Sequence, residues 1–182
     1  MTKSDPIPCT KEEIERIIQA SMEDDFYYMF FKVAKTTGRR LGEYYNVKVK
    51  DIDFDKNLMI TLVLKKRRKV EREAILTPEI SEFIHRYIIK NKMKLDDYVF
   101  RKVGYRQIQN KVKFYAKKAE IKHNVSFHNF RHYFITELVK KGWSYDKIAK
   151  LTGHTSVGTI SVYDHAIASD IKEDALEALK DI

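Results

Sequence analysis

Residues 127–134 read FHNFRHYF, with a histidine and an arginine three positions apart among aromatic residues. On a helix His128 and Arg131 would lie on one face, because residues three apart are neighbours on a helix surface. Phe130 and Phe134 can then form the opposite, buried stripe. An imidazole and a guanidinium aimed together suit a single anion. The alternative is a histidine at a helix start and a surface arginine, and the short HxxR pattern alone favours that alternative.

Two other interpretations concern nearby residues. His128 and His132 stand four apart, a spacing that can hold zinc. The glutamate of an HExxH motif is missing, because Asn129 takes its place, and no acidic third ligand is nearby. We therefore predict no metal site at His128 and His132. The segment 148–163, IAKLTGHTSVGTISVY, resembles a helix-turn-helix, which would make the protein a DNA-binding regulator without catalysis.

The composition agrees with a partner made of phosphates. The 182 residues include 35 Lys and Arg against 26 Asp and Glu, which gives a net charge of +9 and a pI near 9.4. A single cysteine, Cys9, rules out an internal disulfide framework and suits a reducing compartment. No apolar stretch approaches the ~20 residues of a membrane span, and the N-terminus lacks a signal peptide's apolar core. We expect a cytoplasmic protein with no membrane partner.

Basic residues concentrate in two segments. One is KKRRK at 65–69, and the other, 101–122, holds eight Lys or Arg and one Glu. Either run alone is typical of a solvated face. Two runs with interleaved aromatic residues favour a surface for double-stranded DNA. The predicted contacts are Lys65, Arg67, Arg68, Lys69, Arg106, Lys111 and Lys113.

The elements that must position these residues follow from periodicity. Apolar spacing and caps predict helices at 10–22, 24–37, 39–46, 77–92, 105–119, 127–141, 144–152 and 170–181. Alternating β-branched residues predict strands at 47–54, 58–65 and 71–76, and a short one at 98–100. The predicted fold class is α+β: a mostly α-helical domain with a small three-stranded antiparallel sheet.

The stretch 127–165 resembles the C-terminal signature of the tyrosine recombinase, or phage integrase, family. That pattern is His-x-x-Arg, then Gly-His after a short helix, then a tyrosine nine residues beyond that histidine. The segment TGRRLGE at 37–43 is similar to the family's TG-x-R-x-x-E. A helix-turn-helix would need none of these polar residues. The resemblance covers nearly the whole chain, and its motifs are specific in combination.

The resemblance implies a fold with a catalytic site. The implied reaction is site-specific DNA recombination through a 3′-phosphotyrosine. The implied catalytic residues are Arg40, Lys66, His128, Arg131, His154 and Tyr163. The arginines would bind the phosphate's non-bridging oxygens, the histidines would add hydrogen bonds, and His128 would take the proton of the tyrosine nucleophile. The lysine would protonate the departing 5′ oxygen. No metal or other cofactor is implied. A type IB topoisomerase shares this residue set and is the alternative within the same chemistry.

Two assignments stay open. Lys65, Lys66 and Lys69 all suit the family's hairpin lysine, and Lys66 is preferred because it shares strand parity with Ile60 and Leu62, which we expect to be buried. Arg39 stands where the family usually has an apolar residue, but the spacing favours Arg40 as the catalytic arginine.

We predict one catalytic domain over 1–182, without the N-terminal core-binding domain that family members usually carry. The C-terminal helix, about 168–182, has an apolar stripe at Ile171, Ala175, Leu176 and Leu179. It would dock either within the chain or on a neighbouring protomer. We expect self-association into a dimer or tetramer on DNA, and weak or no assembly without it.

Overall fold

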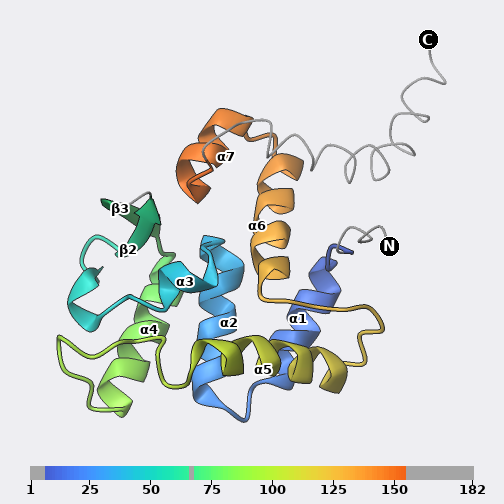
Figure 1. The fold of residues 1–182 in the computed structure, drawn as a ribbon, viewed down its shortest axis with the longest axis horizontal. Coiled ribbons are helices and arrows are strands. Elements are labelled where there is room, and N and C mark those ends of the chain that lie inside the picture. Colours follow the sequence, from blue (N-terminus) through green and yellow to red (C-terminus); the bar gives the residue numbers. More distant parts are fainter. Residues whose placement is uncertain (1–6, 66–67, 155–182) are drawn as a thin grey trace. The chain divides into compact units, whose positions relative to one another are not determined.

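The computed structural model describes residues 7–65 and 68–154, apart from the side chains of 63–69. Within that part the α+β prediction is confirmed: helices dominate and the strands form one antiparallel sheet in the order β1-β2-β3 (Figure 1). The elements are α1 (Lys11–Ala20), α2 (Asp25–Thr37), α3 (Leu41–Tyr44), a 3-10 helix η1 (Val49–Asp51), β1 (Ile52–Asp53), β2 (Leu58–Lys65), β3 (Arg68–Ile75), α4 (Pro78–Lys90), α5 (Tyr105–Lys118), α6 (His128–Lys140) and α7 (Tyr145–Thr152). The predicted helix at 170–181 lies outside the described residues.

The helix starts and stops follow the capping signals in the sequence. Thr10 and Glu13 form the predicted capping box at α1, with the Glu13 N–H donating to Thr10 Oγ1 at 3.2 Å and the Thr10 N–H donating to Glu13 Oε2 at 3.0 Å. Gly38 ends α2 in the left-handed region at φ 58°. Thr77 caps α4 and Pro78 occupies its first position.

The sheet is smaller at one edge than predicted. The predicted strand at 47–54 is wrong over most of its length, because η1 occupies Val49–Asp51 and only Ile52–Asp53 pairs with β2. The cause is local: Asp51 Oδ2 accepts a hydrogen bond from the Lys48 N–H at 2.8 Å and closes a turn. In the described residues the predicted strand at 98–100 is a single bridge between Lys48 and Tyr98.

The hairpin of β2 and β3 buries one face. The paired register runs from Leu58 opposite Ile75 to Lys65 opposite Arg68. Met59 and Thr61 are fully buried, whereas Ile60 is 37% exposed. Met59 and Thr61 therefore face the body of the protein, and Ile60 lies on the opposite face of the hairpin.

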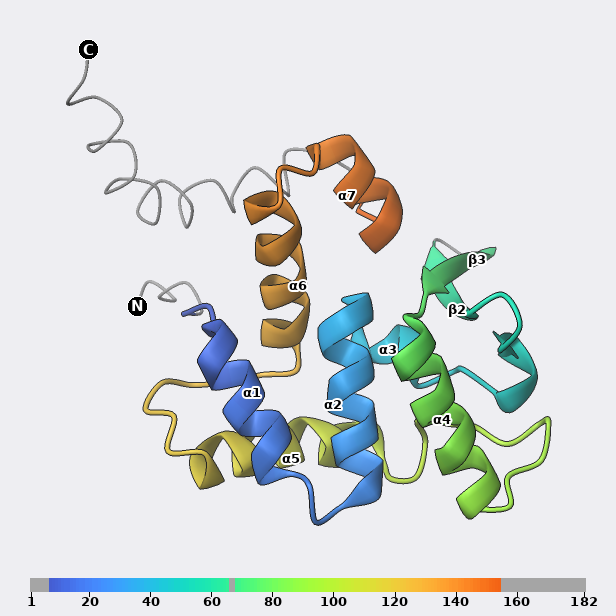
Figure 2. The same ribbon diagram turned by 180° about the vertical axis from the view of Figure 1, so that it is seen from behind.

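An aromatic core centred on α2 positions the start of α6. The Phe30 ring lies 4.8 Å from that of Phe100 and 5.1 Å from that of Phe127, and Phe31 stacks on Phe130 at 5.1 Å. In both views α2 lies between α1 and α4, and α5 crosses beneath α1 and α2 (Figures 1 and 2). Since Phe127 and Phe130 lie on either side of His128 in the sequence, their packing in the core fixes the position of that histidine.

The chain divides into two compact units, Met1–Tyr133 and Phe134–Ile182. The described part of the second unit has a small core of its own, in which Ile135 and Ile148 are fully buried. The prediction of one domain over 1–182 stays a prediction. Across the described residues, no helix is long and apolar enough to cross a membrane.

Candidate active site

Hydrogen bonds hold the backbone of the turn between α2 and α3, which leads to Arg40. The hydroxyls of Thr37 and Tyr44 lie 2.6 Å apart, and the Arg39 N–H donates to the Tyr44 Oη at 2.9 Å. Burial raises the pKa of Tyr44 to about 12, so this phenol stays protonated and holds its partners. The turn therefore presents Arg40 from a rigid backbone.

Arg40 is held by the carboxylate of Glu43 but stays open to solvent. Its Nη1 donates to Glu43 Oε1 at 3.1 Å, and its backbone N–H donates to Glu43 Oε2 at 3.3 Å. The Arg40 side chain is 44% exposed and the Glu43 side chain only 4%. A buried carboxylate thus orients a guanidinium whose other donors can reach an incoming anion.

Arg131, from the first turn of α6, joins the same turn. Its Nη1 donates to the carbonyl of Gly38 at 2.9 Å, across 93 positions of sequence. The side chain is among the largest fully buried ones, with 1% of the residue exposed. Arg40 and Arg131, which lie far apart in the sequence, are therefore anchored to the same three-residue turn.

His128 lies in the field of both arginines. Partial desolvation of its ring, followed by the positive charges of His132, Arg131 and Arg40, lowers the pKa of His128 to about 4. The residue is nevertheless exposed at the surface. At neutral pH the imidazole is uncharged and has a lone pair that can accept a proton.

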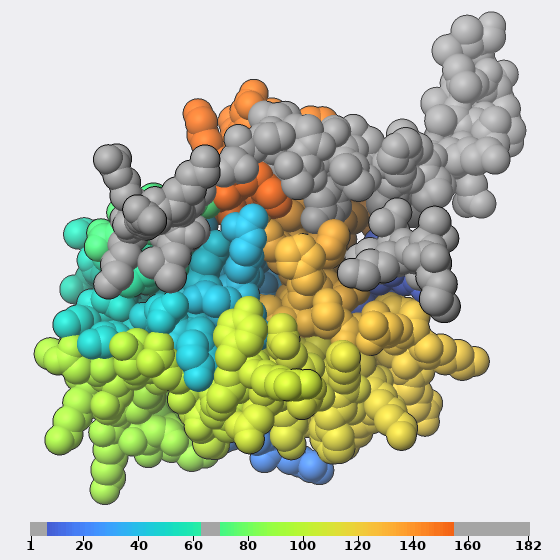
Figure 3. Space-filling model, in the orientation of Figure 1, coloured from blue at the N-terminus to red at the C-terminus, as the bar shows by residue number. Residues whose placement is uncertain are grey.

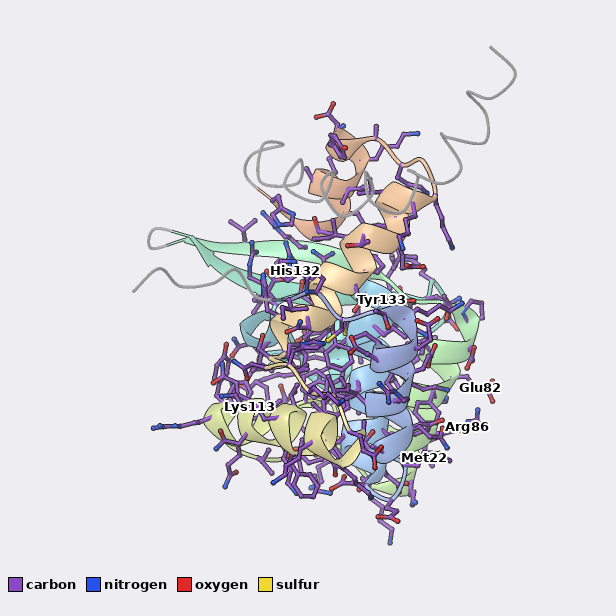
Figure 4. The ribbon with its side chains drawn as sticks, turned by 90° about the vertical axis from the view of Figure 1, so that its right-hand side faces the viewer. Met22, Glu82, Arg86, Lys113, His132 and Tyr133 are labelled. Atoms are coloured by element: carbon purple, nitrogen blue, oxygen red, sulfur yellow. The ribbon has the colours of Figure 1, made fainter. Side chains whose placement is uncertain are left out.

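His132 packs edge-on against His128, with the ring centroids 4.7 Å apart, on the first half of α6 (Figure 4). Burial, and then the charge of Arg131, lowers the pKa of His132 as well. Within the part of the chain that the structure describes, these two rings belong to no group of three metal-ligating side chains. From the sequence, His132 was considered only as a possible metal ligand, and its contact with His128 was not predicted.

His154 belongs to the second unit and is positioned by the end of α7. Gly153 takes the left-handed conformation at φ 75°, and the His154 N–H donates to the Ala149 carbonyl at 3.0 Å. The Thr152 hydroxyl donates to the Ile148 carbonyl at 2.6 Å and lies 2.7 Å from His154 Nδ1. The contact with Thr152 orients the imidazole ring at the end of α7.

One premise behind the choice of hairpin lysine is wrong. The preference for Lys66 assumed that Ile60 and Leu62 face the interior, but Ile60 is 37% exposed while Met59 and Thr61 are fully buried. The expectation that Ile60 is buried is therefore wrong, and the choice among Lys65, Lys66 and Lys69 stays open. Lys66 itself lies outside the described residues, as does Tyr163, and their roles stay predictions.

The predicted DNA contacts divide between two places. Arg106 and Lys113 are exposed on α5, and Lys113 projects outward from that helix (Figure 4). The Lys111 ammonium lies 4.8 Å from the centre of the exposed Phe114 ring. The space-filling view shows α5 covering a broad part of one face (Figure 3). Arg67, and the side chains of Lys65, Arg68 and Lys69, are outside the described part of the chain.

Arg39 behaves unlike its neighbour. It is 2% exposed, and its Nη2 donates to the Glu73 carbonyl of β3, while its Nε and Nη1 have no hydrogen-bond partner. Burial lowers the pKa of Arg39, and Glu43 partly opposes that effect. This difference in exposure supports Arg40, not Arg39, as the arginine that meets a ligand.

The sequence model of the phage integrase family matches residues 9–169. The chain belongs to the phage integrase family. A tyrosine recombinase of Pseudothermotoga lettingae is 28% identical over 170 residues, covering 92% of this chain and 58% of the relative. Tyrosine recombinase XerA of Pyrococcus furiosus is 29% identical, covering 94% of this chain and 61% of the relative. The chain thus spans about three fifths of these relatives.

Solved structures agree on the fold. A XerA recombinase superposes with a TM-score of 0.80 at 26% identity, over 94% of this chain and 66% of that one. A XerH recombinase bound to a palindromic difH substrate, in a post-cleavage complex, gives 0.75 at 20% identity, over 94% of this chain and 53% of that one. The second likeness concerns the fold alone.

Proposed function

We propose that this chain is the catalytic part of a tyrosine site-specific recombinase, which cuts and rejoins DNA strands through a 3′-phosphotyrosine. The observation that carries the proposal is the bond from Arg131 Nη1 to the Gly38 carbonyl at 2.9 Å. It brings an arginine of α6 to the turn that presents Arg40, with His128 inside the field of both. This is the arrangement that a phosphoryl transfer needs.

In the proposed reaction, the Tyr163 oxygen attacks phosphorus and the bond to the 5′ oxygen breaks. The tyrosine proton goes to neutral His128, and a hairpin lysine, Lys66 or Lys65, gives a proton to the departing 5′ oxygen. Arg40 and Arg131 bind the non-bridging oxygens, on which charge accumulates, and His154 adds a hydrogen bond. Joining the phosphotyrosine to a new 5′-hydroxyl completes strand exchange. No step calls for a redox or nucleotide cofactor.

Arg131 is 1% exposed in the DNA-free protein. Because the guanidinium is buried, a phosphate can reach it only if the site opens when DNA binds. We therefore propose that DNA binding and completion of the site are coupled.

The partner in this proposal is double-stranded DNA, contacted by the basic residues of α5 and the hairpin tip. Dimers or tetramers would form on DNA, and the reaction would take place in the cytoplasm. A XerH recombinase bound to difH and a lambda integrase dimer bound to a COC′ core site support the DNA partner by likeness of fold, at 20% and 19% identity.

The test is covalent capture. The protein is incubated, without added metal, with supercoiled plasmid and with a pool of nicked duplexes, and quenched with detergent. A DNA-linked peptide containing Tyr163, with its phosphate attached to a 3′ end, is the expected result. Tyr163→Phe should abolish the adduct, while Tyr28→Phe, which keeps the ring packed 5.5 Å from Phe83, should retain it.

A different outcome would favour another function. DNA binding that survives Tyr163→Phe and Arg40→Ala, with no adduct from the parent protein even when an N-terminal core-binding domain is supplied, supports the helix-turn-helix regulator. Adduct formation with plasmid relaxation but no joining to a new partner supports the topoisomerase-like reaction.

A further inference from the structure

Away from the arginine turn, three side chains with metal-binding atoms lie together. The Cys9 sulfur, a Glu13 carboxylate oxygen and a His123 ring nitrogen all lie within 4.8 Å of one another. Among the described residues, it is the one group of three metal-ligating side chains (His, Cys, Asp or Glu) whose ligand atoms lie this close together. Two of the three come from the start of α1 and the third from the loop between α5 and α6. The cluster therefore joins segments about 110 positions apart in sequence.

The cluster is shielded rather than solvated. Cys9 is 6% exposed, and the side chains of Glu13 and His123 are 19% and 15% exposed. His123 Nε2 lies 3.1 Å from both Glu13 oxygens, and His123 Nδ1 is buried without a hydrogen-bond partner. A thiol, a carboxylate and an imidazole held together out of water form a donor set of mixed softness, which suits Zn²⁺ or Co²⁺ more than Mg²⁺ or Ca²⁺.

The distances between the three ligand atoms are close to those in a tetrahedral zinc site. Zinc bonds of about 2.0–2.3 Å place tetrahedral ligands roughly 3.3–3.8 Å apart. The Glu13 and His123 atoms, 3.1 Å apart, lie slightly closer than this spacing, and all three ligand atoms lie within 4.8 Å of one another, so small side-chain movements would reach it. The thiol proton of Cys9 leaves as H⁺ when the sulfur–metal bond forms.

We propose that Cys9, Glu13 and His123 form a structural site for a divalent transition metal of the Zn²⁺ class, with water as the fourth ligand. This site is separate from the proposed catalytic residues and does not depend on the recombinase proposal. Its role would be to fasten the start of α1 to the loop that leads into α6.

The surroundings show what such a site would stabilise. Asn129, directly after His128, donates to the Ile7 carbonyl at 2.9 Å and accepts from the Ser126 N–H at 2.9 Å. The lead-in to α1 and the first turn of α6 are therefore already linked next to the cluster. A metal at Cys9 would hold the turn that presents His128 in place.

The test uses the full chain, freed of metal with a chelator, and titrated with Co²⁺ and then Zn²⁺. Cys9 is the chain's single cysteine, so a thiolate-to-cobalt charge-transfer band can come from no other residue. We expect one equivalent of Co²⁺ to give that band, Zn²⁺ to displace it, and Zn²⁺ to raise the melting temperature of the parent protein. Cys9→Ser should abolish the band, and His123→Gln should weaken Zn²⁺ binding at least tenfold.

Two histidine variants serve as controls. His85→Gln, at an exposed position on α4, and His128→Gln, which removes one of the paired histidines on α6, should both keep the band. Cobalt that binds without a thiolate band, Zn²⁺ affinity that is equal in the parent and in His123→Gln, or no binding at all would overturn the proposal. Circular dichroism establishes that each variant is folded, and His123→Gln carries the test if Cys9→Ser is not.

Discussion

The starts of α1 and α3 use the same local device for different ends. In each, a glutamate three residues into the helix accepts the N–H of the preceding cap residue: Glu13 from Thr10 at 3.0 Å, and Glu43 from Arg40 at 3.3 Å. Each carboxylate also binds a nitrogen of a basic side chain, His123 for Glu13 and Arg40 for Glu43, at 3.1 Å in both cases.

The two basic side chains differ in origin and in exposure. Arg40 belongs to the capped turn itself and is 44% exposed. His123 comes from a distant loop and is 15% exposed. A partner from the same turn adds no link across the fold, so it can face a ligand. A partner from a remote segment joins two parts of the chain and is buried as they pack together.

Arg40→Ala should produce the largest effect, because it removes the exposed charge and leaves the fold intact. Loss of one donor to a transition-state oxygen costs about 10²–10³ in rate. The cleavage rate on a nicked duplex should fall by that factor, with little change in melting temperature. Arg86→Ala is the matched control, since Arg86 pairs with Glu82 and both project outward from α4 (Figure 4). Equal losses in the two variants would contradict the assignment.

Glu43→Gln should have the next largest effect. The amide keeps the shape of the side chain but loses the charge that holds Arg40. Hydrogen bonds to charged groups contribute about 1.5–3 kcal/mol, so we expect cleavage to slow about ten- to a hundredfold. Glu13→Gln, the equivalent change at α1, should slow cleavage much less and lower the melting temperature. If Glu13→Gln slows cleavage as much as Glu43→Gln, the comparison between the two turns fails.

The pH dependence tests the neutral state of His128. Its pKa is lowered to about 4, so the ring is uncharged above that value and becomes protonated as the pH falls through it. If His128 is the base that limits the reaction, the cleavage rate should stay constant between pH 7 and 5 and fall toward pH 4. NMR titration of the His128 ring, assigned with His128→Asn, measures the pKa directly. A midpoint near the unperturbed 6.5 would contradict the proposed field of Arg131 and Arg40.

Arg39→Met should have the smallest effect, and it should stabilise the protein or leave its stability unchanged. The substitution removes two buried N–H groups that have no partner, and unsatisfied buried groups cost about 1–3 kcal/mol each. It also loses the bond to the Glu73 carbonyl, so we expect the free energy of unfolding to stay equal or rise by about 1 kcal/mol. Urea denaturation measures it. A large loss of cleavage with stability intact would make Arg39 a residue of the site.

Much of the fold and part of the site could be predicted because the signals are local. Capping at Thr10 and Thr77, the stop at Gly38 and the period of α2 all depend on neighbours in sequence. The motif spacing around Arg40 and Arg131 identified the candidate site residues, but only through resemblance to a family.

What failed depends on contacts between distant segments. Which face of β2 is buried is set by what packs on it, so the exposure of Ile60 could not be inferred from alternation alone. The burial of Arg39 against β3, and the meeting of Cys9 with His123, likewise arise from packing. No spacing in the sequence encodes them.

The most direct test of the central claim asks whether Arg40 acts on the charge of the scissile phosphate. Once captured adducts reveal a cleavage site, a duplex is made with a methylphosphonate at that position, which replaces one charged oxygen by a methyl group. Arg40→Ala should lose about 10²–10³ in cleavage rate on the phosphate and far less on the methylphosphonate. An equal loss on both substrates would mean that Arg40 does not neutralise that phosphate, and the proposed convergence of Arg40, Arg131 and His128 on it would be wrong.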